Sequence, residues 1–342
     1  MEKQVTIVSP HDYIDEWHRL LDVSPYRSWF QSPHGFDLYD AQPYLDTFDI
    51  GVMENDQLMG VVVGFIQAEK GPKRFFSRRA IINGGLLLHP SISQNALQAL
   101  LQALKNRTRK AIYVEIRNLY DYSPYATTLE QFGFAYQPHL NIKITCDTWQ
   151  QALKRMDNNR YRVLSKPMPQ GLTHKMANCP AQVKAFYQML QKHYQQKVRK
   201  PLFPYAFFET MIMGETGKLL LLYKDDKLIG GMALLYWPNT ALYDYYACAL
   251  DEQYRDLSPS VWLYGLAIQY AIQHQLPVFD TMGAGKPGVP YGVRDFKLRF
   301  GGELVEHGRF LHINKSFLYR LGVWAMSWSP HRLTASPNHR FF

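Results

Sequence analysis

The feature that most constrains the fold is an internal repeat, in which two distant segments share one pattern of apolar runs and turns. Residues 50–66 and 220–236 each consist of an apolar run, a polar turn, a Leu-x-Gly step and a second apolar run. The turns contain Asn55-Asp56 and Asp225-Asp226, residue types that favour tight turns. The pattern therefore predicts one β-hairpin in each half of the chain.

The elements expected after each hairpin recur in the same order. We predict a strand, a helix and a strand at 84–88, 93–107 and 111–116 in the first half, and at 241–247, 258–275 and 277–280 in the second. A Phe-Gly pair then follows, at Phe132-Gly133 and Phe300-Gly301. Asp56 and Asp226 are 170 positions apart, and Phe132 and Phe300 are 168 apart. This near-constant offset favours duplication of one α/β unit over chance similarity.

The length of the chain, 342 residues, suits two domains. Residues 141–145 alternate like a strand, and 149–163 read as a helix that ends before the proline-containing segment 167–171. We therefore expect a first domain at 1–145 and a second at 146–342, with a junction helix at about 148–165. A cleft between two such domains is the default place for a ligand.

The composition is that of a globular protein with a basic surface. The net charge is +9 and the pI is near 9.2, which favours polyanionic partners such as nucleic acid or nucleotide-linked substrates. A basic solvated surface without a partner explains the charge equally well. The three cysteines, Cys146, Cys179 and Cys248, are far apart and form no CxxC pair, which argues against a disulfide framework and a structural zinc site.

Two observations bear on localisation. The first residues lack the basic start and apolar core of a signal peptide, and no apolar stretch approaches the ~20 residues that span a bilayer. We expect a cytoplasmic protein. Residues 317–328 are amphipathic and contain two Trp residues, so peripheral contact with the inner membrane surface is one interpretation of this segment. A terminal helix packed on the second domain is the interpretation that we favour.

Several enzyme classes lack their motifs in this sequence. It contains no HExxH, GxSxG or Walker pattern and no close cluster of His, Cys and carboxylate residues, so we expect no metal site. Asp280 ends a predicted strand, where side chains often face a cleft. Cations and a tyrosine follow it within twenty residues, namely Tyr291, Arg294, Lys297 and Arg299. They could hold a phosphorylated or carboxylated substrate, or form a solvated, salt-bridged loop.

The duplicated order of hairpin, strand, helix and strand resembles the fold of the Gcn5-related N-acetyltransferases (GNAT). Two copies in one chain, with Phe-Asp-Thr-Met-Gly-Ala-Gly-Lys at 279–286 and Tyr-Gly-Val-Arg-Asp-Phe-Lys-Leu-Arg-Phe-Gly-Gly at 291–302, resemble the FemABX aminoacyltransferases. Further matching pieces lie at 29–32, 159–162 and 193–202. The resemblance implies an α/β fold of two tandem GNAT-like acyltransferase domains, with mixed central sheets flanked by helices.

The resemblance also implies a reaction and a set of site residues. The family moves an amino acid from aminoacyl-tRNA to an amine of a peptidoglycan precursor, which is a UDP-linked or lipid-linked peptide, and needs no further cofactor. Lys297 with Phe296 would then be the catalytic pair, and Lys297 would stabilise the developing oxyanion. Asp280 is a further catalytic candidate. The remaining candidates would bind substrate, and they are Arg199, Tyr243, Tyr245, Lys286, Tyr291 and Arg294.

Two other functions remain open. The first is an acyl-CoA-dependent N-acyltransferase acting on a nucleotide-sugar, peptide or other cell-envelope precursor. Such enzymes hold the pyrophosphate on a glycine-containing loop at a helix N-terminus. The corresponding segment here, 253–258, lacks both glycines, which favours the tRNA donor. The second is a non-catalytic binding protein on a decayed acyltransferase fold, against which the pair Phe296-Lys297 argues.

Overall fold

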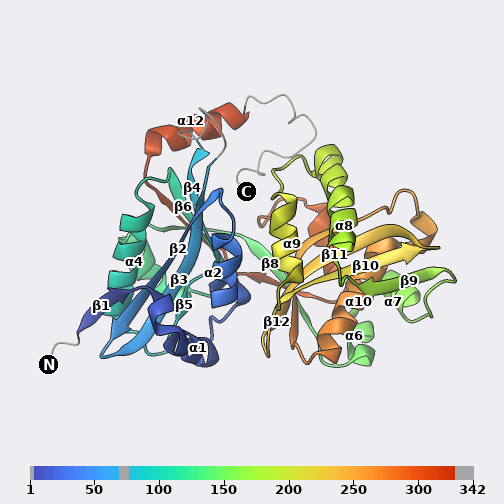
Figure 1. Ribbon diagram of the computed structural model, residues 1–342, viewed down its shortest axis with the longest axis horizontal. Coiled ribbons are helices and arrows are strands. Elements are labelled where there is room, and N and C mark those ends of the chain that lie inside the picture. Colours follow the sequence, from blue (N-terminus) through green and yellow to red (C-terminus); the bar gives the residue numbers. More distant parts are fainter. Residues whose placement is uncertain (1–3, 69–76, 328–342) are drawn as a thin grey trace. The chain divides into compact units, whose positions relative to one another are not determined.

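The computed structural model describes residues 4–68 and 77–327, which form two compact units (Figure 1). Of these described residues, unit 1 comprises 4–139 (without 69–76), 286–289 and 306–327, and unit 2 comprises 140–285 and 290–305. Each unit contains one mixed β-sheet with helices packed on it. This is the α/β architecture that the sequence predicts.

The sheet of unit 1 has the strand order β1-β2-β3-β4-β6-β15-β7, and β5 pairs with β3. The strands are β1 (Val5–Val8), β2 (Leu45–Glu54), β3 (Gln57–Gln67), β4 (Arg79–Gly84), β5 (Leu87–Leu88), β6 (Tyr113–Asn118), β7 (Ala135–Gln137) and β15 (Arg309–Ile313). The helices are α1 (Ile14–Val23), α2 (Pro33–Asp40), α4 (Gln94–Thr108), α5 (Ala126–Gln131) and α12 (Ser316–Ser327). Leucines of α4 and α5 pack with the sheet in a continuous apolar core, and burial of this apolar surface stabilises the unit.

The sheet of unit 2 has the order β14-β8-β13-β12-β11-β10-β9. Its strands are β8 (Leu140–Thr145), β9 (Leu172–Met176), β10 (Gly217–Lys224), β11 (Lys227–Trp237), β12 (Ala241–Ala249), β13 (Val278–Gly283) and β14 (Glu303–Glu306). Its helices are α6 (Trp149–Arg155), α7 (Asn158–Leu164), α8 (Pro180–His193), a π-helix (Tyr194–Val198), α9 (Tyr205–Met213), α10 (Pro259–Gln273) and α11 (Gly292–Leu298). The long apolar helix α10 is buried along most of its length and contacts β10 to β13.

Each sheet contains one strand from the other half of the sequence. β8 lies between β13 and β14 in unit 2, and β15 lies between β6 and β7 in unit 1. The division of the chain therefore differs from the expected domains 1–145 and 146–342. The first boundary precedes β8, and the described C-terminal residues 306–327 belong to unit 1, because hydrogen-bonded strand pairing rather than chain order decides which residues share a core.

The predicted hairpins are present in both units. β2 pairs with β3, and β10 with β11, across two-residue turns. Asn55, Asp56, Asp225 and Asp226 all have positive φ, between 45° and 64°, as the favoured turn of a two-residue hairpin requires. The duplication is thus visible at the level of backbone dihedral angles.

Three predicted elements differ in their bounds. The strand expected at 84–88 is interrupted after β4, because Gly84 and Gly85 adopt φ of 86° and 83°. The single junction helix is two helices, since the Asp157 side chain caps α7 by accepting a hydrogen bond from the Arg160 amide. Asp280 lies inside β13, which continues to Gly283, and not at the end of a strand.

The segment 317–328 is described up to residue 327, and Trp328 lies outside the described residues. Helix α12 belongs to unit 1 rather than to the second domain. Phe317 and Trp324 on this helix are 72% and 56% exposed. None of the helices in the described ranges is long and apolar enough to cross a membrane.

Candidate active site

The candidate site in unit 2 lies where two parallel strands separate. β12 and β13 pair only at Leu242 with Phe279 and at Tyr243 with Asp280. The register of β12 against β11 shifts between Asp244 and Tyr246, so Tyr245 is a bulged residue. Bulges of this kind bend a strand and are common beside active sites.

Lys297 reaches this separation from helix α11. Its Nζ donates a hydrogen bond to the Thr281 carbonyl oxygen on β13 and lies 3.8 Å from Asp244 Oδ2 on β12. Lys297 is only 8% exposed. Burial lowers the pKa of its ammonium group, while the charges of Asp244 and Asp280 act in the opposite direction. The structure thus holds a buried cation between the two diverging strands.

Asp244 links Lys297 to helix α10. Its Oδ2 accepts a hydrogen bond from the Tyr264 hydroxyl at 2.5 Å, and both residues are buried. Burial raises the pKa of Asp244, which Lys297 and Tyr264 partly offset. Tyr264, Asp244 and Lys297 form a buried polar triad, which we call the unit 2 triad.

Asp280 is the second buried carboxylate beside Lys297. It is 2% exposed, and its Oδ1 accepts hydrogen bonds from the Met282 amide at 2.8 Å and from Asn141 Nδ2 at 3.4 Å. Burial raises the pKa of Asp280 to about 6, against the lowering effects of Lys143 and Lys297. A carboxyl group with such a pKa can exchange a proton near neutral pH.

Phe296 lies beside the unit 2 triad in an aromatic cluster. Its ring is 5.2 Å from the ring of Tyr264 and 5.3 Å from that of Phe300. The Arg160 guanidinium lies over both phenyl rings, at 4.9 Å and 5.3 Å from their centroids. Arg160 Nε is buried and has no hydrogen-bond partner among the described residues, so the cluster retains a donor for a ligand.

A second group of aromatic residues follows the bulge. The ring of Tyr245 is 5.0 Å from that of Tyr246, which in turn is 6.0 Å from the ring of Tyr194. Burial and the Asp244 charge raise the pKa of Tyr194. Tyr194 begins the π-helix, and such helices are frequent at functional sites.

The predicted site residues fall into three places. Lys297, Phe296 and Asp280 lie together. Tyr243 is 1% exposed and Tyr245 is half-buried, both on β12. Tyr291 is half-buried at the start of α11, and its hydroxyl group helps to raise the pKa values of Tyr194 and Tyr264.

The structure shows no contact between the other three predicted residues and the unit 2 triad among the described interactions. Arg199 is exposed and ends the π-helix in a left-handed conformation with φ of 55°. Arg294 is a half-buried residue of α11. Lys286 belongs to unit 1 and acts on His139 there, so it lies in a different unit from Lys297.

Sequence reasoning missed the roles of Asp244 and Tyr264. Each is a polar residue within an otherwise apolar strand or helix. This pattern is the sequence feature by which they could have been recognised as site residues. Within residues 4–68 and 77–327, no three His, Cys, Asp or Glu side chains form a group that could hold a metal ion.

The N-terminus of α10 is occupied by the chain itself. The first residue, Pro259, has no amide hydrogen, and the Ser260 amide and hydroxyl both donate to the Asp251 carboxylate. The next amides, of Val261 and Trp262, donate to the Ser258 carbonyl oxygen. An anion would therefore meet a carboxylate rather than unpaired amides at this helix end.

The N-terminus of α4 in unit 1 is closed in a similar way. The Ser93 side chain caps the helix by accepting a hydrogen bond from the Ala96 amide, and its hydroxyl donates to Glu54 Oε1. Glu54 is 4% exposed. Both helix ends thus carry a carboxylate where an anion would otherwise bind.

Comparison with known proteins identifies the fold. Residues 153–297 match the Acetyltransferase (GNAT) domain family. FemX has a similar structure, with a TM-score of 0.72 and 15% identity over 93% of this chain and 99% of FemX. A tandem GNAT protein from the clavulanic acid biosynthesis pathway gives 0.56 and 12% identity, over 92% and 99% of the two chains.

The structure of L-PGS from Bacillus licheniformis is also similar, with a TM-score of 0.53 and 11% identity over 90% of this chain and 95% of that protein. No curated protein matches the sequence. Together with the duplicated sheets described above, these matches show that the chain has a tandem GNAT fold similar to that of FemX.

Proposed function

We propose that this chain is an aminoacyltransferase that moves an aminoacyl group from aminoacyl-tRNA to an amine of a peptidoglycan-precursor-like acceptor. The observation that carries the proposal is the unit 2 triad, with its buried Lys297 between two diverging strands. Burying a cation costs free energy, and a buried lysine in such a place suits a site that must stabilise negative charge. The FemX-like fold supports the same reaction class.

In the proposed reaction, the acceptor amine attacks the carbonyl carbon of the aminoacyl ester. A C–N bond forms, the ester C–O bond breaks, and the amine proton ends on the departing ribose hydroxyl. The oxyanion of the tetrahedral intermediate would be stabilised by the Lys297 ammonium group. Asp280, with its pKa of about 6, is our candidate for holding the proton in transit.

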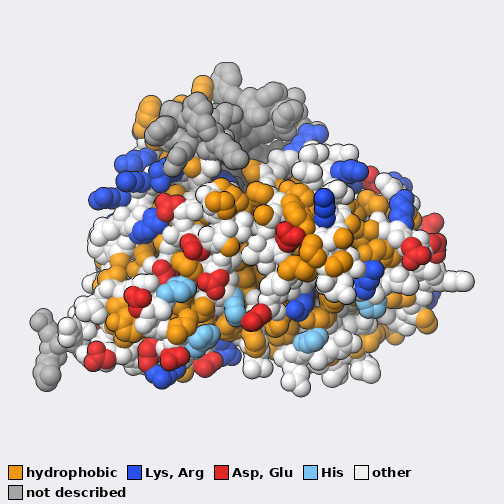
Figure 2. All heavy atoms as spheres, viewed as in Figure 1, with side chains coloured by type: hydrophobic (Ala, Val, Ile, Leu, Met, Phe, Trp, Pro, Cys, Tyr) orange, Lys and Arg blue, Asp and Glu red, His pale blue; other side chains and the backbone are white. Residues whose placement is uncertain are grey.

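Two observations favour tRNA over acyl-CoA as the donor. The α10 and α4 N-termini, where acyl-CoA enzymes of this fold hold the pyrophosphate, carry Asp251 and Glu54. The net charge of +9 favours a polyanionic donor. On the face drawn in Figure 2, acidic side chains lie between the basic ones, so on that face the charge would act as a diffuse field rather than as one patch.

The residues that bind the acceptor substrate are proposed from the chemical character of their side chains. Arg199 would pair with an anionic group of a UDP-linked or lipid-linked precursor, and Tyr243, Tyr245 and Tyr291 would contact its apolar parts. A tRNA donor places the reaction in the cytoplasm, and the exposed Phe317 and Trp324 of α12 would allow peripheral membrane contact.

An assay with parallel donors tests the proposal. The protein is incubated with a mixture of charged tRNAs or with labelled acyl-CoAs, each with UDP-linked and lipid-linked peptide acceptors. We expect product only from charged tRNA, with tRNA binding that weakens as salt rises. Product formed only from acyl-CoA would overturn the donor assignment and support the acyl-CoA alternative. Binding without product from any donor would favour the non-catalytic protein.

A further inference from the structure

Helix α12 of unit 1 presents a row of large apolar side chains to solvent. Phe317, Leu321 and Trp324 are all exposed, and they occupy positions i, i+4 and i+7, which lie on one face of a helix. Arg320, at i+3, is exposed on the same face. Large apolar side chains gathered on a surface are unfavourable in water, so such a row marks a place where another apolar phase or molecule binds.

The opposite side of α12 holds the helix on its own unit. The Tyr319 ring lies 5.6 Å from the ring of Tyr113 at the start of β6, and Figure 1 shows α12 beside this end of the sheet. The Asn314 amide donates a hydrogen bond to the Ile112 carbonyl oxygen at 2.9 Å, and the Asn314 side chain donates to the Thr108 carbonyl oxygen at 3.0 Å. The helix is therefore anchored on one side and leaves the apolar row on the other.

The surroundings of the row are basic. Arg109 and Lys110 lie in the turn to which Asn314 bonds, and both are exposed, as is Arg320. Within residues 4–68 and 77–327, no ion pair or side-chain hydrogen bond of these three cations is observed. The apolar row thus lies close to positive charges that no carboxylate of the described chain neutralises.

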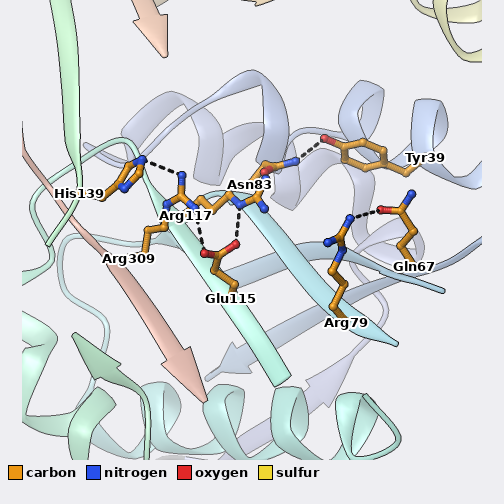
Figure 3. A network of polar contacts seen from close by, with 8 residues as sticks. All are labelled: Tyr39, Gln67, Arg79, Asn83, Glu115, Arg117, His139 and Arg309. Carbon is orange, nitrogen blue, oxygen red and sulfur yellow. Dashed lines mark hydrogen bonds and ion pairs between the residues drawn. The ribbon is translucent and has the colours of Figure 1, made fainter. Parts of the chain in front are cut away.

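The sequence of this part of the chain has a strong charge bias. Residues 307–342 contain five Lys or Arg residues and no Asp or Glu, although the chain has 29 acidic residues in all. One of the five cations, Arg309, pairs with Glu115 in the unit 1 sheet, as Figure 3 shows. The segment contributes +5 to the net charge of +9, which favours an anionic partner for the surface that it includes.

We propose that the exposed face of α12, with Phe317, Arg320, Leu321 and Trp324, binds the surface of a bilayer that contains anionic lipids. The apolar side chains would enter the boundary between headgroups and acyl chains, and the cations would lie among the anionic headgroups. Nucleic acid would match the cations but would leave Leu321 without an apolar partner. A second copy of the chain would cover the apolar row but would bring like charges together.

The proposal gives the peripheral contact of α12 a lipid class and a set of residues. It does not depend on the donor or the acceptor of the transfer reaction, because the face lies in unit 1 and the unit 2 triad lies in unit 2.

Co-sedimentation of the full chain with lipid vesicles tests the proposal. One set of vesicles is made of phosphatidylcholine alone, and the other of phosphatidylcholine mixed with phosphatidylglycerol. We expect binding to the mixed vesicles to be about tenfold or more stronger than binding to phosphatidylcholine, and to weaken as salt rises, because salt screens the attraction between the cations and the headgroups.

Two pairs of variants assign the binding to α12. Phe317→Ala should weaken binding to the mixed vesicles about fivefold or more, while Tyr13→Ala, at another exposed aromatic residue of unit 1, should not. Arg320→Glu should weaken the binding about tenfold or more. Lys184→Glu, at an exposed residue of α8 in unit 2, changes the net charge by the same amount and should leave the binding unchanged.

The proposal is overturned if the unaltered chain does not bind the mixed vesicles, or if Phe317→Ala and Arg320→Glu bind them as their controls do. Variants that lose tRNA binding while they keep vesicle binding would assign the face to nucleic acid instead. Self-association that Phe317→Ala abolishes, in a chain that binds no vesicles, would assign it to a second copy. Vesicle binding requires no transfer activity, so failure of this proposal and failure of the aminoacyltransferase proposal are separate results.

Discussion

The two units place different chemistry at equivalent points of one duplicated fold. In unit 1, the parallel strands β4 and β6 pair along six residues, from Arg79 with Tyr113 to Gly84 with Asn118. In unit 2, the parallel strands β12 and β13 pair at two residues and then separate. The sheet is therefore closed in unit 1 and open in unit 2, at the place where Lys297 lies.

The strand registers identify the residues that correspond. Ile81 and Tyr243 pair with Phe65 and Leu235 on the preceding strands, so the next residues, Ile82 and Asp244, are equivalent. Counting back from the two Phe-Gly pairs makes Leu129 equivalent to Lys297.

Tyr264 also has an apolar counterpart. Gly60 and Gly230 occupy the same register position, and the side chains nearest to them come from Leu100 and Leu263, which makes Leu101 the equivalent of Tyr264. The unit 2 triad of Tyr264, Asp244 and Lys297 thus replaces Leu101, Ile82 and Leu129, which are all buried in the unit 1 core. An apolar set is enough to fold this unit, so we infer that the polar set is retained for function.

Two carboxylates at equivalent positions, Glu115 and Asp280, also differ between the units. Glu115 pairs with Ile81 across the sheet as Asp280 pairs with Tyr243. Burial raises both pKa values, but the charges and hydrogen bonds of Arg117 and Arg309 hold the pKa of Glu115 at about 2. Asp280 has no arginine partner among the described contacts, and its pKa is about 6. The same position is a fixed anion in one unit and a titratable acid in the other.

The largest expected effect on stability comes from Glu115→Gln. Because the folded-state pKa lies below the ordinary value of 4.5, the carboxylate contributes stability that is complete above pH 4.5 and is lost as the pH falls toward 2. We expect the variant to lose about 3 kcal/mol of unfolding free energy at pH 7 and much less at pH 3. Urea denaturation at both pH values measures this. A loss that is the same at both would contradict the ion-pair explanation.

Asp280→Asn is expected to change the unfolding free energy in the opposite direction, by stabilising the folded chain. Its folded-state pKa of about 6 lies above 3.8, so the ionised form destabilises the folded chain fully above pH 6, and this penalty fades as the pH falls to 3.8. The variant should therefore gain up to about 3 kcal/mol at pH 8 and nothing from this source at pH 3.8. If denaturation curves show that Asp280→Asn loses stability at pH 8, the proposed difference between Asp280 and Glu115 is wrong.

A double-mutant cycle in the unit 2 triad should show an intermediate effect. Lys297→Leu leaves Asp244 buried without its cation, and Asp244→Ile leaves Lys297 without its anion. The double variant restores the apolar pair found in unit 1. We expect it to be more stable than the sum of the single changes predicts, by about 1–3 kcal/mol. Additive single effects would show that the two charges do not interact.

The smallest expected effect comes from Tyr264→Phe. This change removes the hydroxyl that donates to Asp244 and should cost about 1 kcal/mol of stability. Tyr270→Phe on the same helix is the matched control, because no hydrogen bond of its hydroxyl is observed among the described residues. Thermal denaturation of both variants measures the difference. An equal loss of stability in the two variants would mean that the hydrogen bond from Tyr264 to Asp244 does not stabilise the protein.

The sequence predicted those features that have a local cause. Both hairpins were predictable because Asn55-Asp56 and Asp225-Asp226 suit a left-handed two-residue turn. The Phe-Gly pairs were also predictable, since Gly133 and Gly301 end a helical turn with φ of 81° and 77°. The family resemblance pointed to Lys297, which the structure places in a buried polar site.

Features that depend on distant pairing were not predictable. β8 and β15 are short strands, and no local residue indicates which sheet they join. The separation of β12 from β13 depends on the pairing of residues that are 37 positions apart, Leu242 with Phe279 and Tyr243 with Asp280. Asp244 could be recognised as a partner of Lys297 only after both strands and α11 had been placed.

The most direct test of the central claim is the single-turnover rate of aminoacyl transfer from charged tRNA, measured for the unaltered protein and for Lys297→Ala with tRNA saturating. Loss of a group that stabilises the oxyanion typically costs about 10²–10³ in rate. We predict a loss of that size with unchanged tRNA affinity, while Lys315→Ala transfers at the normal rate. Transfer by Lys297→Ala at the normal rate would contradict the assignment of the active site to unit 2.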